Sequence, residues 1–215
     1  MNMSPDTSTR KTIVKMLKTS GPLGVSEIAK RLGITEMAVR RHLNTLERDG
    51  YVDSALVRQS MGRPMHVYRL TEAADDLFPK KYHSLALDLL GELEDDASGR
   101  MIELLFERRK EKLLRNYGAK MEGHSFPEKV AKLAEIQNAN GYMVEMESRD
   151  EHFLLKEYNC PISQVASRYE EACESEKKLF EQLLDANVER LECLAKGGGK
   201  CVYQIKPIPS ESNSL

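Results

Sequence analysis

A single glycine between two short amphipathic segments is the feature that most constrains how this chain can fold. Residues 27–32 and 36–48 each place apolar side chains at helical spacing, and Gly33 lies between them. Glycine enters the left-handed conformation of a tight turn without the ~1–2 kcal/mol that a Cβ atom costs there. Ser26 stands at the N-cap position of the first segment and Thr35 at that of the second. The spacing therefore predicts a helix-turn-helix.

The flanking segments extend this pattern to a winged helix. Residues 9–19 have helical spacing, and residues 51–57 and 66–70 are strand-like segments separated by a Gly-Arg-Pro turn at 62–64. Helix, helix, turn, helix and hairpin, in that order, is the arrangement of a winged helix-turn-helix. The apolar residues expected to face its core are Val25, Ile28, Ala29, Leu32, Ile34, Val39, Leu43 and Leu46.

The polar face of the second segment is typical of a DNA-recognition helix, whose N-terminal residues enter the major groove. Arg40 and Arg41 can donate to guanine or phosphate, and Thr35 to a backbone oxygen. Arg63, at the hairpin tip, is placed to reach a minor groove or a phosphate. The alternative is a winged helix that binds a protein and leaves these arginines solvated. The predicted DNA-binding residues are Ser26, Thr35, Glu36, Met37, Arg40, Arg41, Asn44 and Arg63.

Charge is unevenly distributed along the 215 residues. The net charge is −2, yet residues 1–82 hold 14 Lys and Arg against 9 Asp and Glu, which makes that part +5 and the remainder −7. Only the front of the chain is therefore expected to face a polyanion such as double-stranded DNA. The apolar runs are far shorter than the ~18 residues of a membrane span, and the first residues lack the features of a signal peptide. We expect a soluble cytoplasmic protein with no membrane partner.

The remainder of the chain mixes helical and strand-like segments, so the expected fold class is α+β. Residues 84–96 and 98–117 are helical, with an apolar stripe beside dense charge, which favours dimerisation; packing within the chain is the alternative. The segments that follow are predicted as a helix at 127–140, strands at 142–147 and 152–158, helices at 162–168 and 169–190, and a strand at 201–205. The expected domains are a winged helix-turn-helix DNA-binding domain (1–82), central dimerisation helices (83–125), a small α+β cysteine-bearing module (126–206) and a flexible tail (207–215).

All four cysteines lie within a stretch of 42 residues in the second half of the chain. They are Cys160, Cys173, Cys193 and Cys201. No two of them have the two-residue gap of a zinc ribbon, so their spacing alone is weak evidence for a metal site. Thiolates are ligands for zinc and for iron–sulfur clusters, and residue types do not choose between the two. The alternative is that the cysteines are small apolar residues on buried faces.

Several segments resemble the SufR-like regulators of iron–sulfur cluster biosynthesis in bacteria. In the front half these are residues 25–52, 61–64 (MGRP) and 68–73 (YRLTEA). In the cysteine-bearing half, which is the more specific part, they are 157–162 (EYNCPI) and 193–203. The resemblance implies a homodimer with a [4Fe–4S] cluster in each subunit, whose cluster-bound form represses the cluster-assembly operon.

The ligands of that cluster follow from the same resemblance. It implies that Cys160, Cys173 and Cys201 are ligands, with either Cys193 or a non-cysteine group as the fourth. In this interpretation the cluster holds a helix to the sheet, and its loss alters the spacing of two DNA-recognition heads through the long helices.

Three other functions fit parts of the sequence. The same regulator architecture is compatible with structural zinc. A thiol-dependent redox protein with a protein-docking winged helix requires a reactive cysteine of low pKa. A purely structural interaction protein predicts no salt-dependent DNA binding. The sequence contains no HExxH pair and no phosphate-binding glycine loop, so we expect that the protein is not an enzyme.

Overall fold

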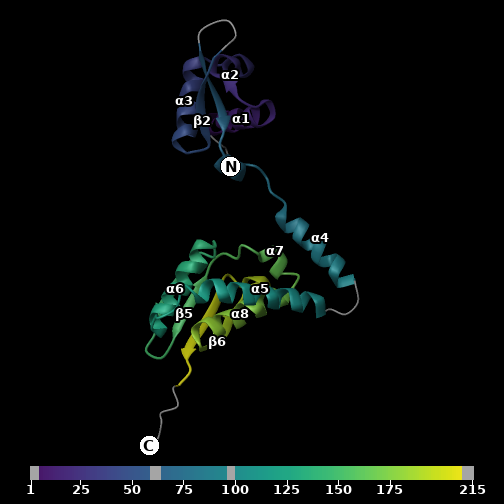
Figure 1. Cartoon of the computed structure of the whole chain (residues 1–215), viewed down its shortest axis with the longest axis vertical. Helices are drawn as coiled ribbons and strands as arrows, with labels where there is room; N and C mark the ends of the chain where they lie inside the picture. Colours follow the sequence, from purple (N-terminus) through teal and green to yellow (C-terminus); the bar gives the residue numbers. More distant parts are fainter. Residues whose placement is uncertain (1–4, 59–63, 96–99, 210–215) are drawn as a thin grey trace, which may run out of the picture. The chain divides into compact units, whose positions relative to one another are not determined.

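The computed structural model describes residues 5–58, 64–95 and 100–209 (Figure 1). The chain divides into two compact units, Met1–Lys80 and Lys81–Leu215. Each unit has its own hydrophobic core. The expected α+β class is confirmed, since each unit combines helices with an antiparallel sheet.

The N-terminal unit has the predicted winged-helix order. The three-stranded antiparallel sheet has the order β1-β3-β2. The short strand β1, which precedes α2, therefore adds a third strand to the β2–β3 hairpin. Gly33 ends α2 in the left-handed conformation with φ of 65°, as the sequence predicts. The elements are α1 (Pro5–Ser20), β1 (Leu23–Gly24), α2 (Val25–Leu32), α3 (Glu36–Arg48), β2 (Val52–Val57), β3 (Met65–Leu70) and the 3-10 helix η1 (Glu72–Leu77).

The predicted core residues of this unit face inward. Ile28, Val39 and Leu43 are completely buried, and Val25, Ala29 and Leu46 are nearly so. Leu32 and Ile34 are partly buried and pack against the same cluster. Ile13 and Leu17 of α1 close the core from the other side, so α1, α2 and α3 enclose one apolar interior.

The predicted N-cap of α2, the first helix of the helix-turn-helix, is wrong. α2 begins at Val25, and its N-cap is Gly24, with φ of −84° and ψ of 159°. Gly24 belongs to β1 and is already extended because it pairs with Val67 of β3. The helix therefore starts two residues earlier than the sequence pattern indicates. Ser26 lies inside the first turn, and its hydroxyl donates to Glu36 on α3 at 2.6 Å.

The C-terminal unit places helices against a four-stranded antiparallel sheet of order β4-β5-β7-β6 (Figure 1). β7, the last strand in the sequence, is therefore an inner strand between β5 and β6. The elements are α4 (Tyr82–Asp95), α5 (Arg100–Gly118), α6 (Phe126–Ala139), β4 (Val144–Ser148), β5 (Phe153–Glu157), α7 (Ser163–Ala166), α8 (Glu170–Leu184), β6 (Ala186–Glu192), the 3-10 helix η2 (Leu194–Lys196) and β7 (Cys201–Pro207).

The predicted helix over residues 169–190 is wrong in its last six residues. α8 ends at Leu184, and Asp185 turns the chain with a left-handed φ of 48°. Residues 186–192 then form β6, with buried Ala186 and Val188 alternating with exposed Asn187 and Glu189. Phe180, Leu184, Val188 and Leu191 keep helical spacing across this boundary, which is why periodicity alone missed the strand.

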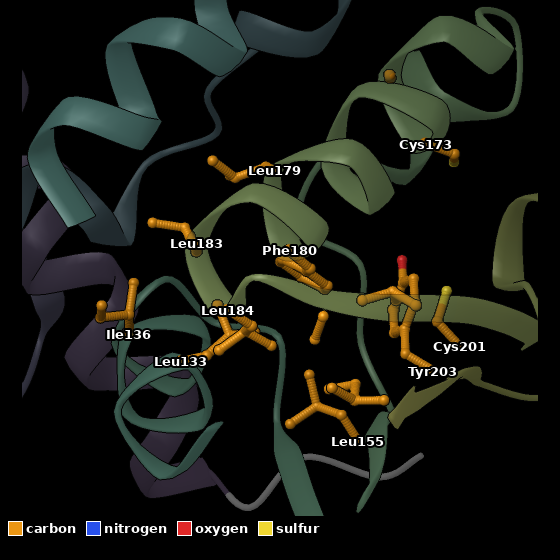
Figure 2. Packing of buried hydrophobic residues seen from close by; sticks show 14 of the residues in the cluster. Leu133, Ile136, Leu155, Cys173, Leu179, Phe180, Leu183, Leu184, Cys201 and Tyr203 are labelled. Atoms are coloured by element: carbon orange, nitrogen blue, oxygen red, sulfur yellow. The ribbon is translucent and has the colours of Figure 1, made fainter. Parts of the chain in front are cut away.

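The core of the C-terminal unit lies between α8 and the sheet. Phe180 of α8 packs edge-on against Tyr203 of β7, with ring centroids 5.0 Å apart. Figure 2 shows both rings beside Leu155 of β5 and Leu133 of α6. α5 adds Ile102 and Phe106 to the same cluster. The sheet is thereby tied to α8, and α8 to the long helix α5.

Candidate DNA-recognition helix and thiol cluster

The start of α3 has the geometry of a recognition helix. The Thr35 hydroxyl caps it by accepting from the Ala38 N–H at 3.2 Å. Met37, directly after the first helical residue, is 79% exposed. Seven of the eight predicted DNA-binding residues are exposed, and Arg63 lies outside the described residues; the seven are Ser26, Thr35, Glu36, Met37, Arg40, Arg41 and Asn44.

A short polar chain links α2 to the exposed face of α3. Ser26 donates to Glu36, and Glu36 pairs with Arg40 one helical turn later at 3.6 Å. Both members of that ion pair are half exposed, so the pair itself contributes at most ~0.5 kcal/mol. Arg40 can therefore exchange this partner for a phosphate or a base at little cost. Whether these residues contact DNA stays a prediction.

The four cysteines come from four different places in the C-terminal unit. Cys160 follows β5 and is partly buried, whereas the other three are buried. Cys173 lies in the second turn of α8, and Cys201 is the first residue of β7 (Figure 2). Cys193 directly follows β6, so it lies at the end of a strand and not after a helix as the sequence pattern indicates.

Cys193 is the common neighbour of the other three thiols. It lies close enough to Cys160, Cys173 and Cys201 to influence the pKa of each, and it is hydrogen-bonded to Cys173. Burial raises the pKa of Cys160 to about 11, and those of Cys173 and Cys201 to about 12. These three groups are therefore neutral thiols at pH 7, so a reactive low-pKa cysteine is not found among them.

Backbone N–H groups point at two of the sulfur atoms. The Leu194 N–H donates to the Cys201 Sγ at 3.4 Å, and the Ile162 N–H donates to Cys160. Each of these donors favours the thiolate form and opposes the effect of burial on the pKa. The loops after β5 and β6 are thus oriented to stabilise negative charge on sulfur.

A buried carboxyl group, Glu157, and a partly buried one, Glu176, adjoin the cysteines, and neither is expected from the sequence pattern. Glu157 is directly opposite Cys201 in the β5–β7 register, and Glu176 is one helical turn after Cys173. Gln137 donates to Glu157 at 3.0 Å, and the Tyr203 hydroxyl donates to Glu176 at 3.1 Å. Burial, followed by repulsion from Glu176, raises the pKa of Glu157 to about 8.

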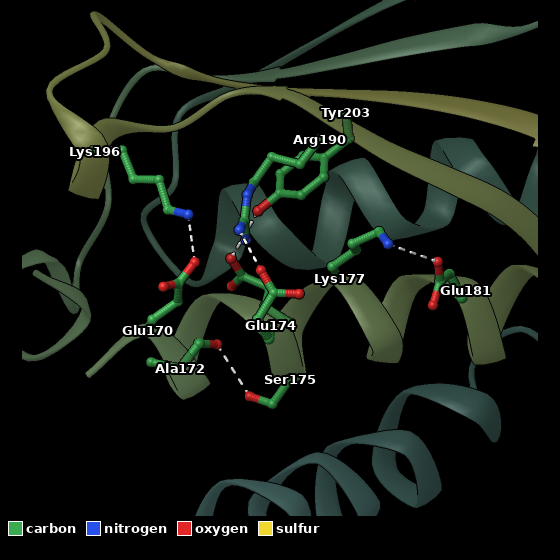
Figure 3. Close-up of polar contacts among 10 residues, drawn as sticks. Glu170, Ala172, Glu174, Ser175, Lys177, Glu181, Arg190, Lys196 and Tyr203 are labelled. Atoms are coloured by element: carbon green, nitrogen blue, oxygen red, sulfur yellow. Dashed lines mark hydrogen bonds and ion pairs between the residues drawn. The ribbon is translucent and has the colours of Figure 1, made fainter. Parts of the chain in front are cut away.

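Arg190 of β6 brings a positive charge to the same region. Figure 3 shows its guanidinium group pairing with Glu174 of α8, at 2.5 Å, beside the Tyr203 ring. Its Nη1 is buried without a hydrogen-bond partner among the described residues. Arg190 also acts to lower the pKa of Cys173, although burial outweighs it. The thiol cluster therefore has one unmet donor that suits an anionic centre.

The donor set fits a thiolate-bound metal in its chemistry, but it is not arranged around one. Four neighbouring thiols, two sulfur-directed N–H groups and the Arg190 donor are complementary to an anionic iron–sulfur or zinc centre. Across residues 5–58, 64–95 and 100–209, no group of three or more His, Cys, Asp or Glu is positioned to hold a metal ion. Metal binding would therefore require the thiols to lose their protons and to close on the ion.

Comparison with known proteins bears on the N-terminal unit. Residues 7–54 match the family described as "Bacterial regulatory protein, arsR family". A curated relative is the "Probable C4-dicarboxylate response regulator DctR" of Halalkalibacterium halodurans, 33% identical over 63 residues. That alignment covers 29% of this chain and 27% of the relative, so the chain matches about a quarter of that protein's length.

Solved structures with some similarity include two proteins in complex with DNA. The Zα domain of Carassius auratus PKZ, bound to Z-DNA, is 28% identical, covers 32% of this chain and all of that domain (100%), and has a TM-score of 0.27. Bacillus subtilis PadR with operator DNA is 15% identical, covers 66% of this chain and 93% of PadR, and has a TM-score of 0.31.

The family match and the observed element order agree on the front of the chain. By both criteria the N-terminal unit is a winged helix-turn-helix of the kind found in bacterial regulatory proteins. The match ends at residue 54 and does not reach the first cysteine. Among the described helices, none has the length and apolar character to cross a membrane.

Proposed function

We propose that this protein is a transcriptional regulator that binds a double-stranded DNA operator as a homodimer and holds a [4Fe–4S] cluster on Cys160, Cys173, Cys201 and Cys193. In this proposal the cluster-bound protein represses genes for iron–sulfur cluster assembly. The observation that best supports this cofactor is the position of Cys193. It neighbours all three of the other thiols, although the four cysteines are spread over 42 residues. The choice of target genes rests on the resemblance to SufR-like regulators.

The residues around the thiols would hold such a centre by charge and hydrogen bonding. Arg190 brings its unmet Nη1 and its positive charge, which offset part of the negative charge of four thiolates. The Leu194 and Ile162 N–H groups donate to two of the sulfurs. A bound cluster would supply a link between α8 and the sheet that is sensitive to oxidants and to iron supply.

The dimer in this proposal is supported by an apolar stripe on α4. Leu87 and Leu90 on one face of α4 pack against the core, and Glu94 pairs with Arg168 at 3.1 Å. The opposite face leaves Tyr82, Leu85 and Leu89 between 56% and 72% exposed. A second copy would cover this stripe, and two copies would supply the paired heads that a half-site operator requires. Replacing Leu85 and Leu89 with Glu is expected to convert a dimer to monomers in light-scattering measurements.

The first test is the visible spectrum of the anaerobically purified protein, with iron, sulfide and zinc assayed on the same sample. We expect a broad band near ~400 nm that bleaches in air, together with iron and acid-labile sulfide. Colourless protein that contains zinc would favour the second candidate, structural zinc on the same four thiols. Colourless, metal-free protein that also fails anaerobic reconstitution with iron and sulfide would contradict both.

Two cysteine variants then sharpen the assignment. Cys173→Ser is expected to lose the cluster and to weaken binding to a duplex selected in vitro with the cluster-loaded protein, while its helical circular dichroism remains. Cys193→Ser distinguishes the fourth ligand, because retained iron and sulfide in that variant would assign the fourth position to another group. Operator binding by Cys173→Ser as tight as that of the loaded protein would contradict a cluster-controlled switch.

A further inference from the structure

A pocket of about 610 Å³ lies entirely within the N-terminal unit, away from the exposed face of α3. Its walls come from α1, from the C-terminal end of α3 and from the segment that follows η1. Apolar side chains form much of the lining, among them Val14, Leu46, Tyr51 and Phe78. Pockets of this size and character, with a few polar groups, are typical of small-molecule sites.

Arg10 gives this pocket a polar anchor. It lines the pocket from α1, and its Nε is buried without a hydrogen-bond partner among the described residues. Leaving a buried donor unmet costs ~1–3 kcal/mol, and native proteins nearly always pair such groups. An acceptor supplied by a ligand would remove this cost.

The remaining charges of the pocket define the sign of that ligand. Lys11, next to Arg10 on α1, and Lys15, about one and a half turns further along, also line the pocket. Among the described residues that line the pocket, Asp49 is the only acidic one, and it lies 3.6 Å from Arg48 in an ion pair. The pocket therefore combines an excess of positive charge at α1 with an apolar wall.

We infer that this pocket binds a small amphipathic carboxylic acid, with the carboxylate at Arg10 and Lys15 and the apolar body against Val14, Leu46 and Phe78. Arg10 is partly buried and its Nε is completely covered, and a hydrogen bond to a charged group is worth ~1.5–3 kcal/mol, so the acid is preferred over a neutral molecule of equal length. A nucleic-acid backbone has no apolar part to fill the wall. Because Leu46 is in the last turn of α3, the ligand would contact the recognition helix itself, which is the position of an effector.

The test uses full-length protein, decanoate as the probe and 1-decanol as the uncharged molecule of equal chain length, both followed by isothermal titration calorimetry. We expect decanoate to bind at least tenfold more tightly than 1-decanol. Arg10→Leu should weaken decanoate binding by about 10–100-fold and leave 1-decanol binding nearly unchanged. Lys30→Leu, which removes an exposed cation of α2 outside the pocket, is the matched control and should bind decanoate like the native protein.

Three results would overturn the inference. They are no decanoate binding by the native protein at ~1 mM, a weak affinity by the standards of such sites; equal affinity for decanoate and 1-decanol; or native affinity in both Arg10→Leu and Lys15→Leu. Lys15 is exposed, so Lys15→Leu keeps the test valid if Arg10→Leu fails to fold. We expect Lys15→Leu to weaken decanoate binding by about threefold. The experiment needs no metal, so its outcome is independent of the proposed cluster.

Discussion

The two units of this protein place their chemistry-bearing residues in opposite ways. In the N-terminal unit most polar residues of α3 are exposed, with His42 as a buried exception, and the core beneath them is almost entirely apolar. In the C-terminal unit three cysteines and Glu157 are buried within the packed core, where Arg190 and Glu176 adjoin them. Function at an exposed face can change without affecting folding, whereas function inside a core cannot. The comparison predicts that substitutions in the first unit alter binding and that those in the second alter stability.

The largest expected effect is on the stability of the C-terminal unit. Phe180→Ala removes a completely buried ring that packs on Tyr203, and such truncations cost ~3–5 kcal/mol. Urea denaturation followed by circular dichroism should show the transition of this unit at lower denaturant. Met37→Ala, on the exposed face of α3, serves as the control and should change stability by less than ~0.5 kcal/mol.

The next effect is on DNA binding, with stability unchanged. Arg40→Ala combined with Arg41→Ala is expected to weaken binding to an in-vitro-selected duplex by ~100-fold, or ~2.7 kcal/mol. If both arginines contact phosphates, the slope of log affinity against log salt should fall by about 2. Fluorescence anisotropy at several salt concentrations measures both quantities. A large loss of thermal stability in this variant would contradict the separation between exposed function and apolar core.

A third effect tests the buried carboxyl group in metal-free protein. The pKa of Glu157 is raised to about 8 in the folded state, so the native protein binds a proton that the unfolded chain releases near its ordinary value of 4.5. This contribution to stability is complete below pH 4.5 and is lost as the pH rises through 8. Glu157→Gln keeps an acceptor for Gln137 but cannot ionise. It is expected to flatten the stability–pH curve over that range, with a gain of up to ~4 kcal/mol at pH 8.

Parallel pH curves for the native protein and Glu157→Gln would show that this carboxyl group does not titrate abnormally. Glu145→Gln, at an exposed position on the neighbouring strand β4, is the matched control. Its curve should follow that of the native protein.

The smallest effect concerns the contact between α2 and α3. Ser26→Ala removes the hydroxyl that donates to Glu36, an exposed interaction worth at most ~0.5 kcal/mol. We expect a change in DNA affinity of less than threefold, because Arg40 keeps its place on α3. A tenfold loss of affinity, measured by the same anisotropy assay, would show that Ser26 contacts DNA directly.

The N-terminal unit was almost entirely predictable because its signals are local. Gly33, the cap at Thr35 and the spacing of Val39, Leu43 and Leu46 act within one or two helical turns. Ser26 was misplaced because the extended conformation of Gly24 depends on pairing with β3, more than forty residues later. His42, buried on α3, was missed because a helical face is inferred from apolar residues.

The candidate site of the C-terminal unit was predictable only in its residue types. The strand that ends beside Cys193 was hidden by apolar residues at helical spacing, so the sequence pattern predicts a helix before that cysteine. The alternation of Phe153, Leu155 and Glu157 on one face of β5 was a signal that a carboxyl group would face the core. No local pattern could indicate Arg190 as a neighbour of the thiols, because its contact with Glu174 depends on how β6 packs on α8.

The inner position of β7 has a consequence for synthesis on the ribosome. β5 can pair with β4 soon after both leave the exit tunnel. Its other edge, which includes Phe153, stays unpaired until β7 with Ile205 has been synthesised. Cys160, Cys173 and Cys193 are therefore translated before the strand that closes their surroundings. During that interval the nascent thiols are accessible to solvent and to cellular factors. Delivery of the proposed cluster would therefore compete with the final step of folding for the same short period.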